Sequence, residues 1–503
     1  MISPSISDSY RAGYGLTVFD TPVSRRLFVT LVLLLVLYQS ADVFDVPWIV
    51  DSLNYIGPMA LGIVTCLTGV RLIRREPNAV WTPFFWFLCG IVLFYSLGPL
   101  VYTFGGHASR EYLDRMLPVV VTSGDLLQTN TLNVVGIASI LMGFRFGRFF
   151  RSRTRLGQYP HGWSGHVARI KLLSLWLLFS GGVLQYLLIL PWEFGFYGFV
   201  LPGVIWNLAK LYLFGLMGMA YMVSYGVRKW RLPLYTLWFL QILIALIHFS
   251  KSELMMTIML PSLGFYLASK NMKSLFKAAF FMIISYVLLA QFIHYARSEI
   301  RYLSGGAQRV SVEQRIGIIG DWLSGQDFRY ESAQSKLSST ETAWTRLSYV
   351  NVQTFAMGQY DRGVPGDTLS AALIVLMPRV LWPEKPVTIR MSQDFYELVT
   401  GVKSSTHLGL GLFGEGYWNY GWLGVIVVGL ITGFIFRVTS SWSLKWMAQG
   451  SIEYMPSIFL GINMALLGTT QFFANAIIGA FGFIVFYMLF VSKVFSGLVL
   501  SAK

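Results

Sequence analysis

The side chains best suited to chemistry in this sequence are cations that could hold a phosphate group. Arginine offers a rigid fork of donors that matches phosphate oxygens, whereas lysine supplies a point charge. Any single arginine or lysine at a membrane surface could equally extend its charge to water and anchor a helix. As a set they favour binding of an anionic headgroup, and the candidates are Arg297, Arg301, Arg379 and Arg390, with Lys251 and Lys385 as weaker members.

Two residues are candidates for taking a proton from an attacking hydroxyl. Glu415 stands between glycines at the start of an apolar segment, where partial removal from water makes a carboxylate a better proton acceptor. The alternative for Glu415 is a buried carboxylate that pairs with an arginine and holds a loop in place. His407 precedes it and is the second candidate, with an ordinary polar loop residue as the alternative.

The sequence offers no recognisable metal or nucleotide site. Its histidines show no ligand spacing, and residues 297–415 contain no Asp-x-Asp pair that could hold a divalent ion with a diphosphate. The glycine pair Gly409 and Gly411 lacks the strand and helix of a nucleotide-binding loop. We therefore expect chemistry that needs neither a metal nor a cofactor.

Composition places the chain in the class of polytopic membrane proteins. Apolar residues make up 55% of its 503 residues and charged residues 13%, whereas soluble proteins average about 25% charged residues. A span needs about 20 apolar residues and must satisfy its own backbone hydrogen bonds, so each span is expected to be a helix. The sequence predicts an all-α protein with about twelve spans, near residues 27–45, 48–70, 79–103, 125–146, 172–190, 200–225, 232–249, 254–268, 278–296, 418–436, 455–471 and 477–491.

Basic clusters at every second boundary between these spans predict the orientation. This is the positive-inside pattern, and it predicts that both termini face the cytoplasm. Residues 297–415 hold 12 basic and 12 acidic residues, so the net charge of +15 comes from the rest of the chain. Topology accounts for that charge without a nucleic-acid partner. The clusters lie at residues 25–26, 71–75, 145–155, 228–231 and 270–277.

A long extracytoplasmic loop is expected at residues 297–417, between nine spans in residues 1–296 and three spans in residues 418–503. Loops beyond about 15 residues are usually functional or disordered. The tryptophans, tyrosines and aliphatic residues of this loop argue against disorder.

Four segments of this loop carry structural signals. Residues 311–323 have apolar residues at helical spacing and predict an interfacial helix. Residues 369–377 are apolar but too short to span, which favours a re-entrant helix. Prolines in residues 378–386 and glycines in residues 407–421 predict non-helical backbone at membrane depth, which is tolerated where it lines a cavity.

Two motifs in this region resemble those of the Wzy-type oligosaccharide repeat-unit polymerases. Pro-Arg-x-x-Trp-Pro-x-Lys-Pro begins at Pro378, and Gly-Glu-x-Tyr-x-Asn-x-Gly-Trp-x-Gly begins at Gly414. The family often carries a Gly-Ser-Arg-Gly or Gly-Ser-Lys-Gly turn before its eighth span. Here the corresponding residues keep Lys251 but neither glycine, and Glu253 is added. The resemblance covers roughly residues 250–421.

The resemblance implies a GT-C-like glycosyltransferase of the bacterial inner membrane that joins undecaprenyl diphosphate-linked oligosaccharides at the periplasmic face, with inversion at the anomeric carbon. The cations would bind the diphosphate and stabilise it as it leaves, and Glu415 or His407 would take the acceptor proton. Tyr417, Asn419 and Trp382 would contact sugar rings, although an aromatic belt also accounts for interfacial aromatic residues. Membrane lipids and a chain-length regulator of the same pathway are the implied partners.

Two other functions fit the same sequence. An O-antigen ligase uses the same donor and a similar architecture but a different acceptor, and the motif pairing favours a polymerase over it. A flippase or other transporter of lipid-linked oligosaccharides would be expected to show internal repeats and polar residues at mid-membrane. The sequence shows no repeat, and Lys210 is its main charge within a span.

Overall fold

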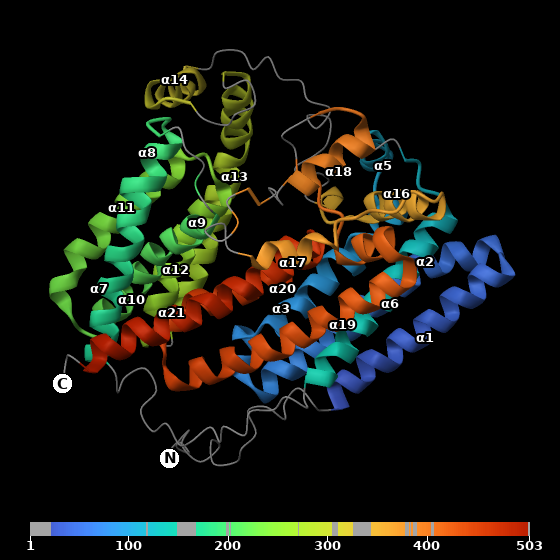
Figure 1. The fold of residues 1–503 in the computed structure, drawn as a ribbon, viewed down its shortest axis with the longest axis horizontal. Helices are drawn as coiled ribbons and strands as arrows, with labels where there is room; N and C mark the ends of the chain where they lie inside the picture. The colour runs from blue at the N-terminus through green and yellow to red at the C-terminus, as the bar shows by residue number, and fades with distance from the viewer. Residues whose placement is uncertain are drawn as a thin grey trace. The chain divides into compact units, whose positions relative to one another are not determined.

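The computed structural model describes most of the chain, and every regular element in the described residues is a helix (Figure 1). This confirms the all-α class. The described residues are 22–116, 119–147, 167–197, 201, 203–269, 271–303, 310–324, 344–377, 382, 384–385, 390–403 and 407–500.

Within the described residues, eight helical segments are long and apolar enough to cross a membrane, as expected of a polytopic membrane protein. The other predicted spans fall mainly in α12 (Lys251–Ser269), α13 (Met272–Leu303), α20 (Met455–Leu466) and α21 (Ala480–Leu500). The count of twelve spans and their orientation stay predictions. The eight segments are Arg25–Phe44, Pro47–Arg75, Pro83–Phe104, Ser123–Phe146, Ala168–Glu193, Gly203–Ser224, Arg228–Ile247 and Leu412–Gln449.

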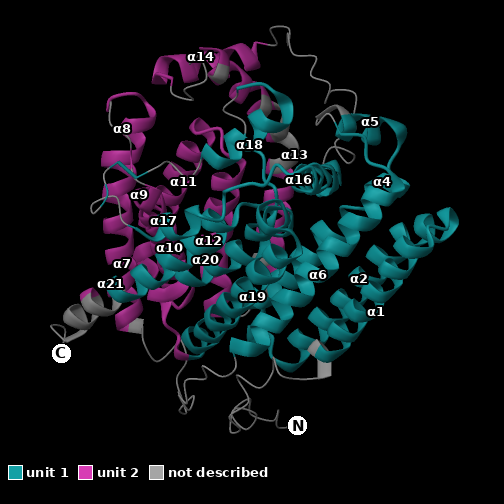
Figure 2. Ribbon diagram, turned by 45° about the vertical axis from the view of Figure 1, so that its right-hand side comes forward, with its two compact units in different colours: residues 1–159, 332–448, 457–490 teal, residues 160–331, 449–456, 491–503 magenta. Residues whose placement is uncertain are grey.

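The chain folds as two compact units, coloured separately in Figure 2. This division differs from the predicted division into spans and a loop, because residues 297–417 contribute to both units. Unit 1 comprises Met1–Tyr159, Ser332–Ala448 and Ser457–Phe490, and unit 2 comprises Pro160–Glu331, Gln449–Pro456 and Val491–Lys503.

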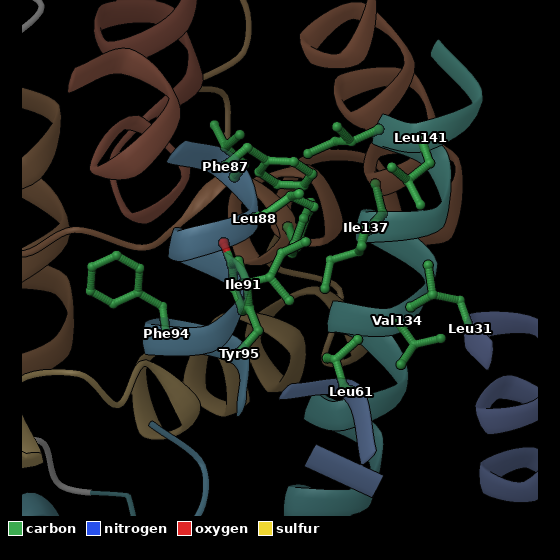
Figure 3. Packing of buried hydrophobic residues seen from close by; sticks show 14 of the residues in the cluster. Leu31, Leu61, Phe87, Leu88, Ile91, Phe94, Tyr95, Val134, Ile137 and Leu141 are labelled. Atoms are coloured by element: carbon green, nitrogen blue, oxygen red, sulfur yellow. The ribbon is translucent and has the colours of Figure 1, made fainter. Parts of the chain in front are cut away.

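The core of unit 1 is a continuous cluster of aliphatic and aromatic side chains. In Figure 3, Leu88 and Ile91 lie opposite Ile137, with Leu61 and Leu31 from two further helices nearby. Most residues of the core come from α1 (Pro22–Phe44), α2 (Pro47–Arg75), α3 (Pro83–Gly90), η4 (Ile91–Leu97), α6 (Ser123–Phe146) and α19 (Leu412–Gln449), and α20 adds Met464 and Ala465.

The backbones of α6 and α19 touch where they cross. A Cβ atom on Gly143 would lie 2.0 Å from the carbonyl oxygen of Leu430, and one on Gly433 would lie 1.9 Å from that of Ile140. Lipid tails are as apolar as core side chains, so helices in a membrane associate through close packing at small residues. Glycine is therefore required at both positions of this crossing.

The predicted short helix at residues 369–377 is present but covers only α17 (Ala371–Leu376). The prediction of non-helical backbone throughout residues 407–421 is wrong, because α19 begins at Leu412 and the backbone is helical to Asn419. The other elements of unit 1 are η3 (Pro77–Trp81), α4 (Val101–Phe104), α5 (His107–Met116), α16 (Val350–Asp361), α18 (Met391–Thr400), η12 (Gly468–Thr470) and η13 (Ala474–Gly479).

The central helix of unit 2 is α10 (Leu211–Ser224), which is almost wholly buried. It packs against α12 and α7 (Val167–Leu184) through close backbone approaches. A Cβ atom on Gly181 would lie 2.1 Å from the Tyr212 nitrogen, and one on Gly264 would lie 2.1 Å from the Met217 oxygen. The remaining elements are η7 (Gln185–Ile189), α8 (Leu190–Glu193), α9 (Gly203–Ala209), η8 (Arg228–Trp230), α11 (Arg231–Ile247), α14 (Val312–Leu323) and η11 (Ile452–Tyr454).

The helix predicted for residues 311–323 is confirmed as α14. Ser311 caps it, because its hydroxyl accepts from the Gln314 N–H while the Gln314 side chain accepts from the Ser311 N–H. Ile318 of α14 packs into a cluster with Ile293 and Ile300 of α13. That α14 lies on a membrane surface stays a prediction.

Candidate functional site

Helix α19 reverses direction at Tyr420 and Gly421, which are the only two non-helical residues within it. Gly421 has φ 57° and ψ −147°, a conformation that is essentially restricted to glycine. The helical segments on either side then cross closely, since a Cβ atom on Gly424 would lie 2.0 Å from the Gly416 oxygen. Three glycines of the second motif therefore build a tight helical reversal.

The polar side chains of the same motif hold residues 361–369 against this reversal. The Tyr417 hydroxyl donates to Asp361 Oδ1 at 3.0 Å, and Trp418 Nε1 donates to the Val364 oxygen at 3.2 Å. Asn419 is only 4% exposed, donates to Thr368 Oγ1 at 3.0 Å and accepts from the Leu369 N–H at 3.2 Å. Tyr417 and Asn419, predicted to contact sugars, thus have partners within the protein, and their role towards sugars stays a prediction.

Glu415 is fully buried, at 0% exposure. Its Oε2 accepts from the Phe473 N–H at 2.5 Å, so the carboxylate caps the helical turn η13 that leads into α21. A carboxylate at a helix N-terminus satisfies a free N–H and complements the positive end of the helix. No ion pair of Glu415 is recorded in the described residues, so the alternative of an arginine partner finds no support there. Its role as a proton acceptor stays a prediction.

His407 has the opposite environment, because its side chain is exposed. Its Nδ1 lies 2.7 Å from the Ser392 hydroxyl oxygen, and the Leu408 N–H donates to the Ser392 carbonyl at 3.2 Å. Ser392 is in the first turn of α18, two residues after Arg390, which is also exposed. Burial of part of the ring lowers the pKa of His407, so the imidazole is neutral at neutral pH. Unit 1 thus fixes an accessible imidazole against Ser392, a residue of the helical turn that begins at Arg390.

Two other predicted residues lie nearby in the sequence. Lys385 Nζ donates to the carbonyls of Val375 at 2.9 Å and Met377 at 2.8 Å, so this ammonium binds the free carbonyls at the end of α17. Trp382 is 40% exposed. Arg379 lies outside the described residues. The first motif is therefore seen only in part, and the role of Lys385 towards a diphosphate stays a prediction.

The cations of unit 2 meet at the turn between α11 and α12. Arg315 Nη1 donates to the Ile247 carbonyl at 2.8 Å, and Arg297 Nε donates to the Phe249 carbonyl at 3.1 Å. Phe249 has φ 50°, an uncommon conformation for a residue other than glycine. Lys251 begins α12 two residues later. Arg301 lies in the last turn of α13, and nothing is described of its side chain.

Arg315, which sequence reasoning missed, is the most deeply placed of these cations. It is 4% exposed, and its guanidinium carbon lies 5.6 Å from the ring centroid of Phe194 and 5.9 Å from that of Phe249. Its Nε has no hydrogen-bond partner in the described part of the chain. A buried guanidinium with an unused donor favours an anionic ligand at this turn.

A buried chain of ionisable groups lies beside this turn. His248 stands between two carboxylates, with Nε2 at 2.9 Å from Glu193 Oε2 and Nδ1 at 2.9 Å from Glu253 Oε2. Gln241 Nε2 extends the chain at 3.5 Å from Glu253 Oε1, and Lys210 adds a positive charge that acts on Glu253. None of this was predicted, because the two partners of His248 come from two different helices, Glu193 from α8 and Glu253 from α12.

Burial alone would lower the pKa of His248, but its contacts with Glu193 and Glu253 outweigh burial and raise the pKa to about 9. A histidine whose pKa is raised on folding stabilises the protein fully below its unfolded pKa of 6.5 and loses this stabilisation as pH rises through about 9. We expect the thermal unfolding temperature of the purified chain to decrease as the pH is raised from 6.5 to about 9. The stabilisation lost from His248 over this range is on the order of 3 kcal/mol.

The matched variant for this pH effect is His248→Gln, which keeps the polarity and loses the charge. It is expected to be less stable than the wild type at pH 6 and about equal to it above pH 9. Equal pH dependence of both proteins would show that His248 is not the charged member of this chain.

The predicted residues that the structure describes are divided between the two units. Unit 1 holds His407, Arg390, Lys385 and Glu415, and unit 2 holds Arg297 and Lys251 together with residues that sequence reasoning missed. The missed residues are Arg315, His248, Glu193, Glu253 and Ser392. The sequence carried one local signal for them, a Ser-x-x-Glu pattern at Ser250 and Glu253 that is typical of a helix N-terminus. In the structure the Ser250 hydroxyl accepts from the Glu253 N–H.

In the described residues no group of three or more His, Cys, Asp or Glu is arranged to hold a metal ion. No family model, curated protein or solved structure matches the chain.

Proposed function

We propose that this protein is a membrane glycosyltransferase that polymerises oligosaccharide repeat units carried on undecaprenyl diphosphate. The observation that carries the proposal is the exposed imidazole of His407, which is held by Ser392; Ser392 lies in the first turn of α18, and that turn begins at Arg390. An accessible, neutral and oriented imidazole is suited to take a proton from a hydroxyl. The resemblance of the two motifs to the Wzy-type polymerases supplies the substrate class.

The proposed reaction is an inverting displacement at the anomeric carbon. The acceptor hydroxyl oxygen forms the new glycosidic bond, the bond from the anomeric carbon to the diphosphate breaks, and the diphosphate leaves with the electron pair. The acceptor proton goes to Nε2 of His407, in the tautomer whose Nδ1–H donates to the Ser392 hydroxyl. Diphosphate is already a competent leaving group, so the remaining need is for cations that stabilise it.

The roles of the other residues follow from their surroundings. Arg390 is exposed at the start of α18 and is proposed to bind diphosphate oxygens. Glu415 is proposed to hold the motif in place from its buried position rather than to exchange a proton with substrate. In unit 2, Arg297, Arg315 and Lys251 offer cations for a lipid-linked diphosphate at the turn between α11 and α12.

The test of this function is the pool of lipid-linked glycans in cells that lack the protein. We expect single repeat units on undecaprenyl diphosphate to accumulate on the outer face of the inner membrane and polymer to disappear, with recovery on return of the wild-type gene. Full-length polymer that remains on its lipid carrier would identify a ligase instead. Repeat units held on the cytoplasmic leaflet would identify a transporter and overturn the catalytic proposal.

A further inference from the structure

A cavity of about 580 Å³ lies between α1 and α2 in unit 1, away from the residues assigned to catalysis. Its polar wall is formed by Arg25, Arg26 and Arg71, and its apolar wall includes Val29, Val64 and Leu67. The two helices form a hairpin, so the start of α1 and the end of α2 lie at the same end of the pair (Figure 1). The three guanidinium groups are thus collected at one end of one cavity.

These positions follow the helical repeat. On α2 the lining residues Val64, Leu67 and Arg71 are three and four residues apart, and on α1 Arg25 and Val29 are four apart, so each set forms a stripe on one helix face. Along both stripes the arginines lie towards the helix end and the aliphatic residues lie towards the middle of the span. The cavity is therefore cationic near the start of α1 and the end of α2, and apolar towards the middle of the two helices.

The other polar groups of the cavity are already satisfied. The Thr30 hydroxyl donates to the Arg26 carbonyl at 3.0 Å, and the Thr68 hydroxyl donates to the Val64 carbonyl at 2.7 Å. No acidic side chain is found among the described lining residues, and no ion pair of the three arginines is recorded in the described part of the chain. The charge of the cavity is therefore uncompensated by the described protein.

We propose that this cavity binds the phosphate headgroup of an anionic phospholipid. The arginine forks match phosphate oxygens, and the acyl chains would follow Val29, Val64 and Leu67 onto the exposed aliphatic faces that continue at Leu33 and Ile63. The inward apolar wall favours a lipid over a free phosphate ion, which would gain nothing from it. Basic pockets between membrane helices bind anionic headgroups in this way.

The experiment is native mass spectrometry of the purified full chain, titrated with dioleoyl phosphatidylglycerol or with dioleoyl phosphatidylcholine. The variant carries Arg25→Gln, Arg26→Gln and Arg71→Gln, and its matched control carries Arg74→Gln, Arg75→Gln and Arg145→Gln, which removes the same charge from exposed arginines outside the cavity. Since each arginine near an anionic lipid is worth roughly a fivefold change in binding, we expect the cavity variant to bind phosphatidylglycerol at least about tenfold more weakly than the control.

Phosphatidylcholine is expected to bind weakly and equally to all three proteins. A lysine version of the cavity variant keeps the charges, loses the guanidinium forks and guards against misfolding, so it is expected to bind phosphatidylglycerol more tightly than the glutamine variant and more weakly than the wild type. If the cavity variant and the control lose the same affinity for phosphatidylglycerol, the lipid binds through general surface charge, and the proposal is overturned. Displacement of the lipid by millimolar inorganic phosphate would assign the cavity to a free anion and would also overturn it.

Discussion

Replacing His407 with alanine is expected to lower kcat of glycosyl transfer by about 10² to 10⁴, the usual loss when a positioned general base is removed. In the proposed reaction the imidazole takes the acceptor proton, and its orientation depends on the 2.7 Å contact with Ser392. The measurement is polymer formation from purified lipid-linked repeat units. Because the pKa of His407 is lowered by partial burial, the wild-type rate should rise with pH through a value below 6.5 and then level off.

The control for this prediction is Ser392→Ala, which removes the contact that orients the ring and leaves the imidazole itself. It should reduce kcat less than His407→Ala does, and the double variant should be no slower than His407→Ala alone, because residues that act as a unit are not additive. A His407→Ala enzyme with the wild-type pH profile would contradict the assignment and would return Glu415 to consideration as the base.

Replacing Gly424 with alanine is expected to prevent unit 1 from packing correctly. The new Cβ atom would lie 2.0 Å from the Gly416 carbonyl oxygen, and a backbone atom cannot move aside as a flexible side chain can. Overpacking usually destabilises by about 1 to 3 kcal/mol, and we expect the upper end of this range or more. The measurement is the yield of monodisperse protein together with its unfolding midpoint in detergent.

Gly317→Ala is the matched control, because nothing lies within 4 Å of the position that its Cβ atom would take in α14. It replaces glycine with a better helix former in the interior of a helix and is expected to leave stability unchanged or to raise it by up to about 1 kcal/mol. If Gly424→Ala were as stable as Gly317→Ala, the close crossing at the reversal would not exist in solution.

The membrane class and the helix α14 could be predicted because they depend on local signals. Apolar length indicates the spans, and the apolar spacing of residues 311–323 indicates the helix, with its Ser311 cap in the expected position. The helical backbone of Leu412–Asn419 could not be predicted in the same way. Glycine disfavours a helix by intrinsic propensity, but Gly416 and Gly424 are needed here because two helical segments cross at their backbones.

The network around His248 shows a second limit of sequence reasoning. His248 and Glu253 are close in the sequence, but Glu193 and the arginine Arg315 are brought to them by tertiary folding alone. Lys385, one of the predicted cations, shows the same limit. Its positive charge and its position in the first motif predicted a contact with phosphate, and in the structure its ammonium also donates to two main-chain carbonyls that the sequence did not indicate.

The contact between Glu415 and Phe473 has a consequence for how the protein is made. The two residues are 58 positions apart, so at about 5 to 20 residues per second the carboxylate emerges from the ribosome roughly 3 to 12 s before its partner. During that interval Glu415 has no Phe473 N–H to bind and must be kept in contact with water or with other proteins. Unit 1 can therefore reach its final form only after the C-terminal helices have been synthesised. A chain that stops before Phe473 would leave the Glu415 carboxylate without this hydrogen-bond donor.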